Sequence, residues 1–267
     1  MSTILSIRAL HKEFLSRGTR VVAVQDLDLD IEEGEFITIV GPSGCGKSTL
    51  LNCIIGLVQP TGGTITYHDR QLRGINTEIG YVPQSDYLYP WRTILDNVAF
   101  PLEVRGVGKE ERHEKAREFI QRVGLAGFEN HYPHELSGGM RQRVNIIRTL
   151  IYDPELILMD EPFGPLDAQT RIILQDQLLR LWEEARKTVI FITHDLVEAI
   201  ALADRVVVMT SRPGTIRSVT PIEISRPRDV FRIHSEEAFR TVYDRLWEEL
   251  REEVQRSEEW LQQAAGA

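Results

Sequence analysis

The sequence predicts an α/β fold with a parallel-sheet core, a flanking antiparallel β-lobe and an inserted helical subdomain. Three patterns support this prediction. Short apolar runs are separated by helical patterns, as expected for strands that are buried on both faces of a sheet. Near the start, apolar and polar residues alternate, which is typical of antiparallel strands with one face in water. From about residue 87 to residue 153 the pattern is mainly helical.

The elements of the core and β-lobe follow in order along the chain. Three alternating segments predict the β-lobe, namely residues 4–14, 21–29 and 63–67. Phe36–Val40 is the first core strand, and a glycine-rich loop leads from it into a helix that begins at Lys47 and stops near Gly56. Three later apolar runs predict further core strands over residues 156–159, 189–193 and 206–209.

The helical subdomain and the C-terminal tail have their own patterns. Residues 109–123 and 137–152 place apolar side chains at helical spacing, and Pro154 stops the second of these helices. After Arg226 the same spacing predicts an amphipathic C-terminal helix, which either packs one face on the rest of the chain or stands in solvent. Nine acidic and four basic residues lie between positions 235 and 260, so the tail is strongly acidic.

These patterns predict a main domain followed by an extension. The main domain covers residues 1–225. Its core and β-lobe comprise residues 1–86 and 154–225, and the helical subdomain comprises residues 87–153. The acidic extension covers residues 226–267.

Composition narrows the class of protein. Among the 267 residues, 40 acidic side chains exceed 31 basic ones, so a broad nucleic-acid-binding face is not expected. No apolar run approaches the roughly 20 residues of a membrane-spanning helix, and the charged first 15 residues do not resemble a signal peptide. We therefore expect a cytosolic location. Cys45 and Cys53 fit neither a disulfide scaffold nor a cysteine metal site.

The strongest motif is a G-x-x-x-x-G-K-[ST] loop between the first core strand and its helix. It reads Gly41-Pro42-Ser43-Gly44-Cys45-Gly46-Lys47-Ser48-Thr49. In a P-loop NTPase (RecA-like) core, such glycines let backbone N–H groups surround phosphate oxygens at a helix N-terminus. Lys47 then reaches the β- and γ-phosphates and the Ser48 hydroxyl ligates Mg²⁺. The alternative is a glycine-rich turn with a solvated lysine.

Two neighbours of this loop have expected chemistry. Cys45 lies beside Lys47 and a helix N-terminus, so we expect a stabilised thiolate that is open to alkylation. Asp160 and Glu161 end a later apolar strand, where ligands bind in open α/β folds. Asp160 is suited to hold Mg²⁺, and Glu161 is suited to deprotonate an attacking water. A helix N-cap is the alternative explanation for the two acids.

A third motif identifies a family. The segment Leu136-Ser137-Gly138-Gly139-Met140-Arg141-Gln142-Arg143 resembles the signature sequence of ATP-binding cassette (ABC) ATPases. Around it, Gln84 resembles the Q-loop, Asp167 the D-loop and His194 the switch histidine of that family, all in the family's order. The resemblance covers about residues 4–225, so the main domain is similar to an ABC ATPase cassette.

The resemblance implies ATP and Mg²⁺ as ligands and a role for each motif. Gln84 contacts Mg²⁺ and the attacking water, His194 hydrogen-bonds the γ-phosphate, and Phe14 stacks on adenine. A buried core phenylalanine is the alternative for Phe14. The signature residues Ser137, Gly138 and Gly139, with Asp167, imply contact with nucleotide held by a second ATP-binding subunit. The resemblance thus implies a twofold dimer, either a homodimer or a pair with a closely related chain.

Within the family, residues 89–98 are similar to a stretch of nitrate, sulfonate and taurine importer ATPases, as are residues 211–214. The resemblance places a docked helix of an integral membrane permease near four apolar side chains, Tyr87, Leu88, Tyr89 and Trp91. The alternative is that these side chains fill the core of the helical subdomain. Both readings are compatible in part.

The resulting functional hypothesis is the ATPase subunit of an importer for a small solute, peripheral at the cytoplasmic face of the membrane. Its partners are a second ATP-binding subunit, the permease and, indirectly, an extracytoplasmic solute-binding protein. Alternatives are another importer or exporter family, a small-molecule kinase, or an ABC ATPase that acts on DNA or ribosomes. The last is disfavoured because 89 positions between Ser48 and Ser137 leave no room for a long coiled-coil insertion. Since no nucleotide ligand is expected after Asp195, we expect removal of the tail to leave ATP affinity nearly unchanged.

Overall fold

The computed structural model describes residues 2–16 and 18–265, which divide into two compact units. The first unit holds residues up to Thr77 together with those from Ala185 onward, and the second holds Glu78–Glu184. The second unit contains the helical subdomain expected over residues 87–153, together with neighbouring strands and a long helix. Each unit is described by itself.

The first unit contains the expected antiparallel β-lobe. Its strands are β1 (Thr3–Ser16), β2 (Thr19–Glu32), β4 (Gly62–Tyr67) and β5 (Arg70–Gln71), in the order β2-β1-β4-β5. All three neighbouring pairs are antiparallel, which confirms the prediction from alternating polarity. The register places Leu5 opposite Tyr67, both of them buried, so the inward positions of the two strands meet in the core.

The first unit also contains a parallel group of core strands. β3 (Phe36–Val40) pairs in parallel with both β8 (Thr188–Ile192) and β9 (Arg205–Met209). Every residue of β3 and β8 is buried, which explains why these strands read as apolar runs without alternation. β10 (Ile216–Pro221) pairs antiparallel with β9. Two helices belong to this group, α1 (Lys47–Ile55) and α6 (Leu196–Leu202).

The second unit combines two parallel strands with helices. β6 (Gly80–Val82) pairs in parallel with β7 (Leu156–Asp160). The helices are α2 (Ile94–Val104), α3 (Lys109–Arg122), α4 (Gly138–Leu150) and α5 (Ala168–Ala185), with a 3-10 turn, η1 (Pro133–Glu135). Side chains such as Val98, Ile120 and Ile147, one from each of α2, α3 and α4, form an apolar core for this unit.

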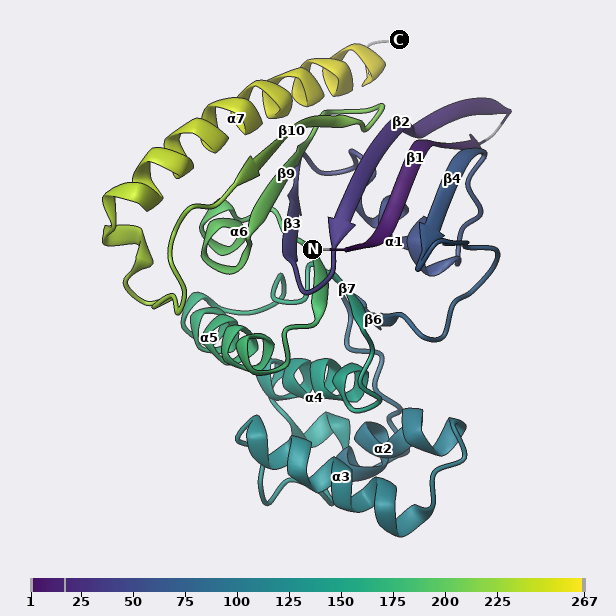
Figure 1. Cartoon of the computed structure of the whole chain (residues 1–267), viewed down its shortest axis with the longest axis vertical. Helices are drawn as coiled ribbons and strands as arrows, with labels where there is room; N and C mark the ends of the chain where they lie inside the picture. Colours follow the sequence, from purple (N-terminus) through teal and green to yellow (C-terminus); the bar gives the residue numbers. More distant parts are fainter. Residues whose placement is uncertain (1, 17, 266–267) are drawn as a thin grey trace. The chain divides into compact units, whose positions relative to one another are not determined.

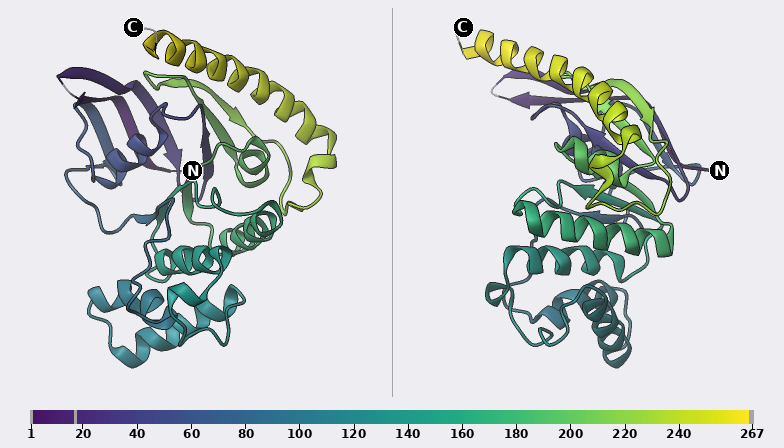
Figure 2. Two further views of the ribbon diagram at one scale, coloured as in Figure 1. Left: turned by 180° about the vertical axis from the view of Figure 1, so that it is seen from behind. Right: turned by 90° about the vertical axis from the view of Figure 1, so that its left-hand side faces the viewer.

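The tail forms a second 3-10 turn, η2 (Ile233–Ser235), and the long helix α7 (Glu237–Ala265). Figures 1 and 2 show α7 along the outer side of β9 and β10, and it contacts α6 and β9. Phe239, Leu246 and Leu250 are buried, whereas Trp247 is 46% exposed. One face of the tail therefore packs on the first unit, which decides between the two sequence-based alternatives.

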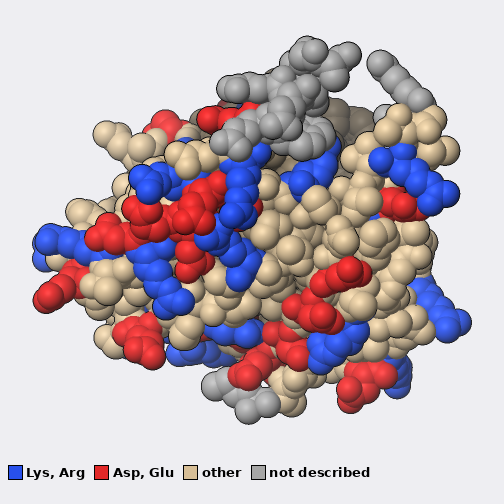
Figure 3. Space-filling view, turned by 90° about the horizontal axis from the view of Figure 1, so that it is seen from above, with Lys and Arg blue, Asp and Glu red and all other residues tan. Residues whose placement is uncertain are grey.

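The acidic tail is partly neutralised by arginines. Within α7, Arg251 lies 2.8 Å from Glu248 and Arg256 lies 2.8 Å from Glu253. On the face seen in Figure 3, basic and acidic side chains of the described residues intermingle. Between residues 2 and 265, excluding residue 17, no helix is long and apolar enough to cross a membrane.

Candidate functional site

The glycine-rich loop in the first unit joins β3 to α1, as the sequence predicts. Gly46 stands at the N-cap of α1 with a φ of 112°, in the left-handed region that favours glycine. A Cβ at this position would lie 2.6 Å from the Ala23 carbonyl oxygen of β2. The loop is thus closely packed on β2 of the β-lobe, and a side chain at position 46 would push either the loop or β2 out of place.

The start of α1 is suited to an anion. No side chain caps its N-terminus, and no acidic residue lies in its first turn. The helix N–H groups and their partial positive charge therefore remain for a negatively charged ligand. Lys47 is buried, and its Nζ donates to the carbonyl oxygens of Gly41 at 2.8 Å and Pro42 at 3.0 Å. A buried ammonium group beside uncapped N–H groups fits a phosphate, so the loop matches the nucleotide predicted for it.

Cys45 differs from the expectation of a reactive thiolate. Its side chain is 1% exposed, and burial raises the pKa of the thiol despite the nearby Lys47 and Arg212. The desolvation of the charged form therefore outweighs the attraction of the cations. The prediction that Cys45 is open to alkylation was wrong because proximity in sequence to Lys47 carries no information about solvent access.

Two further predicted residues of the first unit are exposed. Phe14 lies on β1 opposite Val21 and is 40% exposed, so the alternative of a buried core phenylalanine is wrong. The ammonium of Lys12 lies 4.8 Å from the centroid of its ring. His194 is exposed just beyond the end of β8. Next to it, Asp195 caps α6 by accepting from the N–H of Val197 at 2.8 Å.

In the second unit, β7 carries Asp160 and Glu161 to its carboxyl end. Asp160 is the buried last residue of the strand, and Glu161 follows with a φ of 44°, which is unusual for a residue with a side chain. The Nε2 of Gln84 lies 3.5 Å from Oε2 of Glu161, so the structure brings these two predicted residues together. Burial and the charge of Asp160 raise the pKa of Tyr81 to about 12, so this neighbour stays neutral.

The signature segment begins α4 as the sequence predicts. Ser137 is the N-cap, and its Oγ accepts from the N–H of Met140 at 3.3 Å. A Cβ at Gly139 would lie 2.5 Å from Cγ2 of Thr170, so the start of α4 packs closely on the start of α5. Asp167 precedes α5 and accepts from the N–H of Thr170 at 3.0 Å, a bond that lowers the pKa of Asp167. The signature segment and the Asp167 turn are therefore neighbours.

The apolar segment after Gln84 is divided between core and surface. Leu88 belongs to the buried core of the second unit, and Tyr89 contacts the ring of Phe100 at 4.7 Å between centroids. Tyr87 and Trp91 are 69% and 71% exposed. The core reading is therefore confirmed for Leu88 and in part for Tyr89, whereas docking of a permease helix on the exposed Tyr87 and Trp91 stays a prediction.

Three residues that sequence reasoning missed fix this segment. Asn97 lies on α2 and is fully buried. Its Oδ1 accepts from the N–H of Tyr89 at 2.7 Å, and its Nδ2 donates to the carbonyl oxygens of residues 89, 92 and 93. On α4, Arg148 donates to the carbonyl oxygens of Asp86 and Tyr87, and Arg141 donates to the Asp86 carboxylate at 2.9 Å. Asn97 lay inside a stretch that the sequence singled out, whereas nothing in the pattern marked Arg141 and Arg148 for this role.

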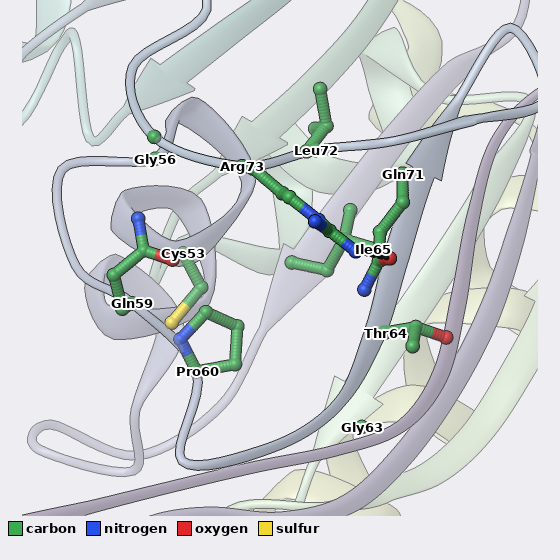
Figure 4. Close-up of a pocket in the computed structure, with 11 residues that line it drawn as sticks. Cys53, Gly56, Gln59, Pro60, Gly63, Thr64, Ile65, Gln71, Leu72 and Arg73 are labelled. Atoms are coloured by element: carbon green, nitrogen blue, oxygen red, sulfur yellow. Dashed lines mark hydrogen bonds between the residues drawn. The ribbon is translucent and has the colours of Figure 1, made fainter.

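A separate pocket of about 350 Å³ opens in the first unit between the end of α1 and the β4–β5 region. Figure 4 shows Arg73 beside Gln71 at its wall, and their side chains are hydrogen-bonded at 3.2 Å. Burial raises the pKa of Cys53, another lining residue, to about 11. None of the residues predicted to bind nucleotide lines this pocket.

A phosphate loop on a buried strand, an uncapped helix after it and a glycine-started helix capped by Ser137 define a nucleotide-binding cassette of the P-loop class. A family model described as ABC transporter matches residues 24–164. The chain belongs to this family, and it is an ATP-hydrolysing cassette. The resemblance to the sulfonate and taurine importer branch of the family is confirmed by the relatives described next.

Several curated relatives align over most of the chain. An uncharacterized ABC transporter ATP-binding protein of Methanocaldococcus jannaschii is 52% identical, over 86% of this chain and 86% of its own length. The aliphatic sulfonates import ATP-binding protein SsuB of Bacillus licheniformis is 43% identical, over 84% and 87%. The taurine import ATP-binding protein TauB of Yersinia pestis is 47% identical, over 80% and 82%.

The fold is also that of solved cassettes. One similar structure is a dimeric, post-hydrolysis ATP-binding cassette bound to ADP and Pi. It is 33% identical with a TM-score of 0.74, and the match covers 83% of this chain and all of that one. The predicted P-loop NTPase core with a β-lobe and a helical subdomain is thereby confirmed.

Proposed function

We propose that this chain is the ATPase subunit of an importer that takes up a small solute of the nitrate, sulfonate or taurine class. The single observation that supports ATP binding is the phosphate loop, where buried Lys47 and a helix N-terminus without a side-chain cap are suited to bind an anion. The solute class rests on the relatives SsuB and TauB, whose names state sulfonate and taurine import. The solute itself is recognised by other subunits.

The residue roles are part of the same proposal. Residues 41–49 bind the phosphates, with Lys47 on the β- and γ-phosphates, and Phe14 packs on adenine. Ser48, Gln84 and Asp160 supply the oxygen ligands that suit Mg²⁺, which neutralises developing charge on the phosphates when it is bound. Glu161 accepts a proton from the attacking water, and its hydrogen bond with Gln84 orients the carboxylate. His194 donates to the γ-phosphate.

The partners follow from exposed features. Ser137, Gly138 and Asp167 are exposed at adjoining helix starts of the second unit, which supports contact with ATP of a second ATP-binding subunit in a homodimer. Exposed Tyr87 and Trp91 support docking of a helix from an integral membrane permease. A solute-binding protein acts indirectly, through that permease. The cassette works peripherally at the cytoplasmic face of the membrane.

Replacing Glu161 with glutamine tests the catalytic part of this proposal. The amide keeps the shape of the side chain but accepts no proton, so hydrolysis should fall about 100-fold or more while ATP binding persists. Phosphate release and binding of a fluorescent ATP analogue measure the two effects. Glu155→Gln, an exposed change just before β7, is the matched control. Hydrolysis by Glu161→Gln at the rate of the control would remove Glu161 from its proposed role.

Co-purification tests the partner part of the proposal. A tagged chain is extracted with native membranes in mild detergent, and mass spectrometry identifies membrane subunits that remain bound. We expect to recover a permease with the unaltered chain. Its recovery should fall at least fivefold for Trp91→Ala, because the substitution removes an exposed ring from the proposed contact. Val104→Ala, at another exposed apolar position of the second unit, should leave recovery unchanged. Equal recovery with both variants would place the permease contact elsewhere.

A further inference from the structure

The C-terminal helix α7 carries a buried carboxylate that no nucleotide role explains. Glu253 is 1% exposed. It accepts from the backbone N–H of Ser211 at 2.8 Å, from the Ser211 hydroxyl at 3.2 Å, from Arg217 at 2.6 Å and from Arg256 at 2.8 Å. Burial by itself would raise the pKa of Glu253, but the Ser211 N–H and the two arginines outweigh it and lower the pKa. The carboxylate is therefore charged, and it links Ser211 to Arg217 of β10 and to Arg256 of its own helix.

That segment is a tight turn between β9 and β10. Thr210 closes it, since its backbone N–H donates to the Thr215 carbonyl at 3.0 Å and its hydroxyl donates to the Pro213 carbonyl at 3.1 Å. Glu253 binds the turn at Ser211, one residue before Arg212. The position of Arg212 therefore depends on a contact made by the tail helix.

The turn between β9 and β10 contacts the phosphate loop directly. Arg212 donates through Nη2 to the carbonyl oxygen of Gly44 at 3.0 Å. Gly214 packs against the backbone of Cys45 so closely that a Cβ would lie 2.0 Å from the Cys45 carbonyl oxygen. Backbone hydrogen bonds from Gly214 to Ala23 and from Gln25 to Gly214 hold the other side of the turn on β2. The turn is thus fixed between the β-lobe and the phosphate loop.

The bond from Arg212 affects how the loop presents itself to an anion. A phosphate loop binds its ligand with N–H groups, and a carbonyl oxygen turned toward the phosphates repels them. Because the Gly44 carbonyl is engaged by Arg212, a peptide flip that aims this oxygen at the ligand would break a charge-assisted hydrogen bond. Holding the loop in its binding conformation before ATP arrives lowers the conformational cost of binding.

We propose that α7 positions the phosphate loop, with Glu253 holding the turn at Ser211 and Arg212 holding the carbonyl of Gly44. Both are positioning residues for nucleotide binding, and neither contacts the reacting atoms. The inference rests on the proposed binding of ATP at this loop. It replaces the expectation that the tail has no effect on ATP affinity.

The test compares variants of the full chain. Arg212→Ala removes the bond to Gly44, and Glu253→Gln weakens the hold on the turn. Glu248→Gln is the matched control, because Glu248 lies on the same helix, is exposed and pairs with Arg251 outside the turn. The dissociation constant of MgATP, the KM and kcat of hydrolysis and the melting temperature without nucleotide are measured for each.

We expect Arg212→Ala to weaken ATP binding and raise KM by about 10-fold, as for loss of one charge-assisted hydrogen bond. Glu253→Gln should act in the same direction, by about 3- to 10-fold. In both variants kcat at saturating ATP should stay within about twofold, since the reacting groups are intact. Arg212→Lys should restore part of the affinity. The double variant should bind no more weakly than Arg212→Ala, since both act through one contact.

Other outcomes of the same measurements would overturn the inference. If Arg212→Ala and Glu253→Gln lower the melting temperature but leave the dissociation constant and KM at the values of Glu248→Gln, the tail is only structural and the inference is overturned. Fully additive losses in the double variant would overturn the link between the two residues. Failure of the unaltered chain to bind ATP, or undiminished binding by Lys47→Ala, would instead overturn the proposed function.

Discussion

Replacing Gly214 with alanine places a methyl group against the phosphate loop. The new Cβ would lie 2.0 Å from the Cys45 carbonyl oxygen and 3.0 Å from Cε of Met209. Ordinary contacts begin near 3.4 Å, so the two backbones must separate by about 1.4 Å. The side chain of Met209 can turn aside, whereas the carbonyl is part of the loop and can move only with it.

We expect this overpacking to cost about 1 to 3 kcal/mol of unfolding free energy. For a chain of this size that corresponds to roughly 2 to 4 °C in melting temperature per kcal/mol. A shift of the loop on the scale of 1 Å should also weaken MgATP binding by about 10-fold or more, because its N–H groups leave their positions.

Gly108→Ala provides the control for this prediction. Gly108 also has a negative φ, and a Cβ there meets nothing within 4 Å. Calorimetry and titration with a fluorescent ATP analogue measure both variants. Equal melting temperatures and equal affinities for Gly214→Ala and Gly108→Ala would refute the reasoning that the turn is wedged against the loop.

Three other outcomes follow from the burial and hydrogen bonds of single residues. Cys45 should react slowly with maleimide at pH 8 in the native protein and rapidly in urea, because burial raises the pKa of its thiol. Mass spectrometry of a Cys53→Ser variant measures the labelling rate, and fast labelling of the native protein would contradict the prediction. Asn97→Asp should cost about 2 to 4 kcal/mol in urea unfolding, because a carboxylate would face three carbonyl oxygens, whereas exposed Asn130→Asp should be neutral. The pKa of Glu253 is lowered in the folded state, so the charged carboxylate stabilises the fold at neutral pH and this stabilisation is lost as pH falls. The melting temperature of Glu253→Gln should therefore approach that of the unaltered chain below a pH of about 4. A gap that stays constant from pH 7 to pH 3.5 would rule out this contribution.

The parts of the site that were predictable from sequence are those built by neighbours in the chain. The loop from Gly41 to Thr49 and the cap at Ser137 depend on local spacing, glycine positions and side-chain capping, so their structure follows from a short segment. The buried strands were equally predictable, since β3 and β8 are apolar at every position but one.

The parts that escaped prediction depend on residues far apart in the chain. The Cys45 thiol is desolvated by the packed loop, which is in turn contacted by Gly214 some 169 positions later. Glu253 reads as one more acid of a solvated helix, and only its partners Ser211 and Arg217 show that it is buried. β10 was not predicted because only one of its six residues is buried, so it lacks the continuous apolar run of its neighbour β9.

The way the segment around Tyr89 is held bears on how such a protein changes over time. Asn97 and Arg148 bind it almost wholly through main-chain atoms, and these atoms are the same whatever side chain a position carries. Substitutions at exposed Tyr87 or Trp91 therefore leave the shape of the segment intact. The proposed contact with a permease can therefore change through a few substitutions at the surface, without refolding the helical core that fixes the shape of the segment.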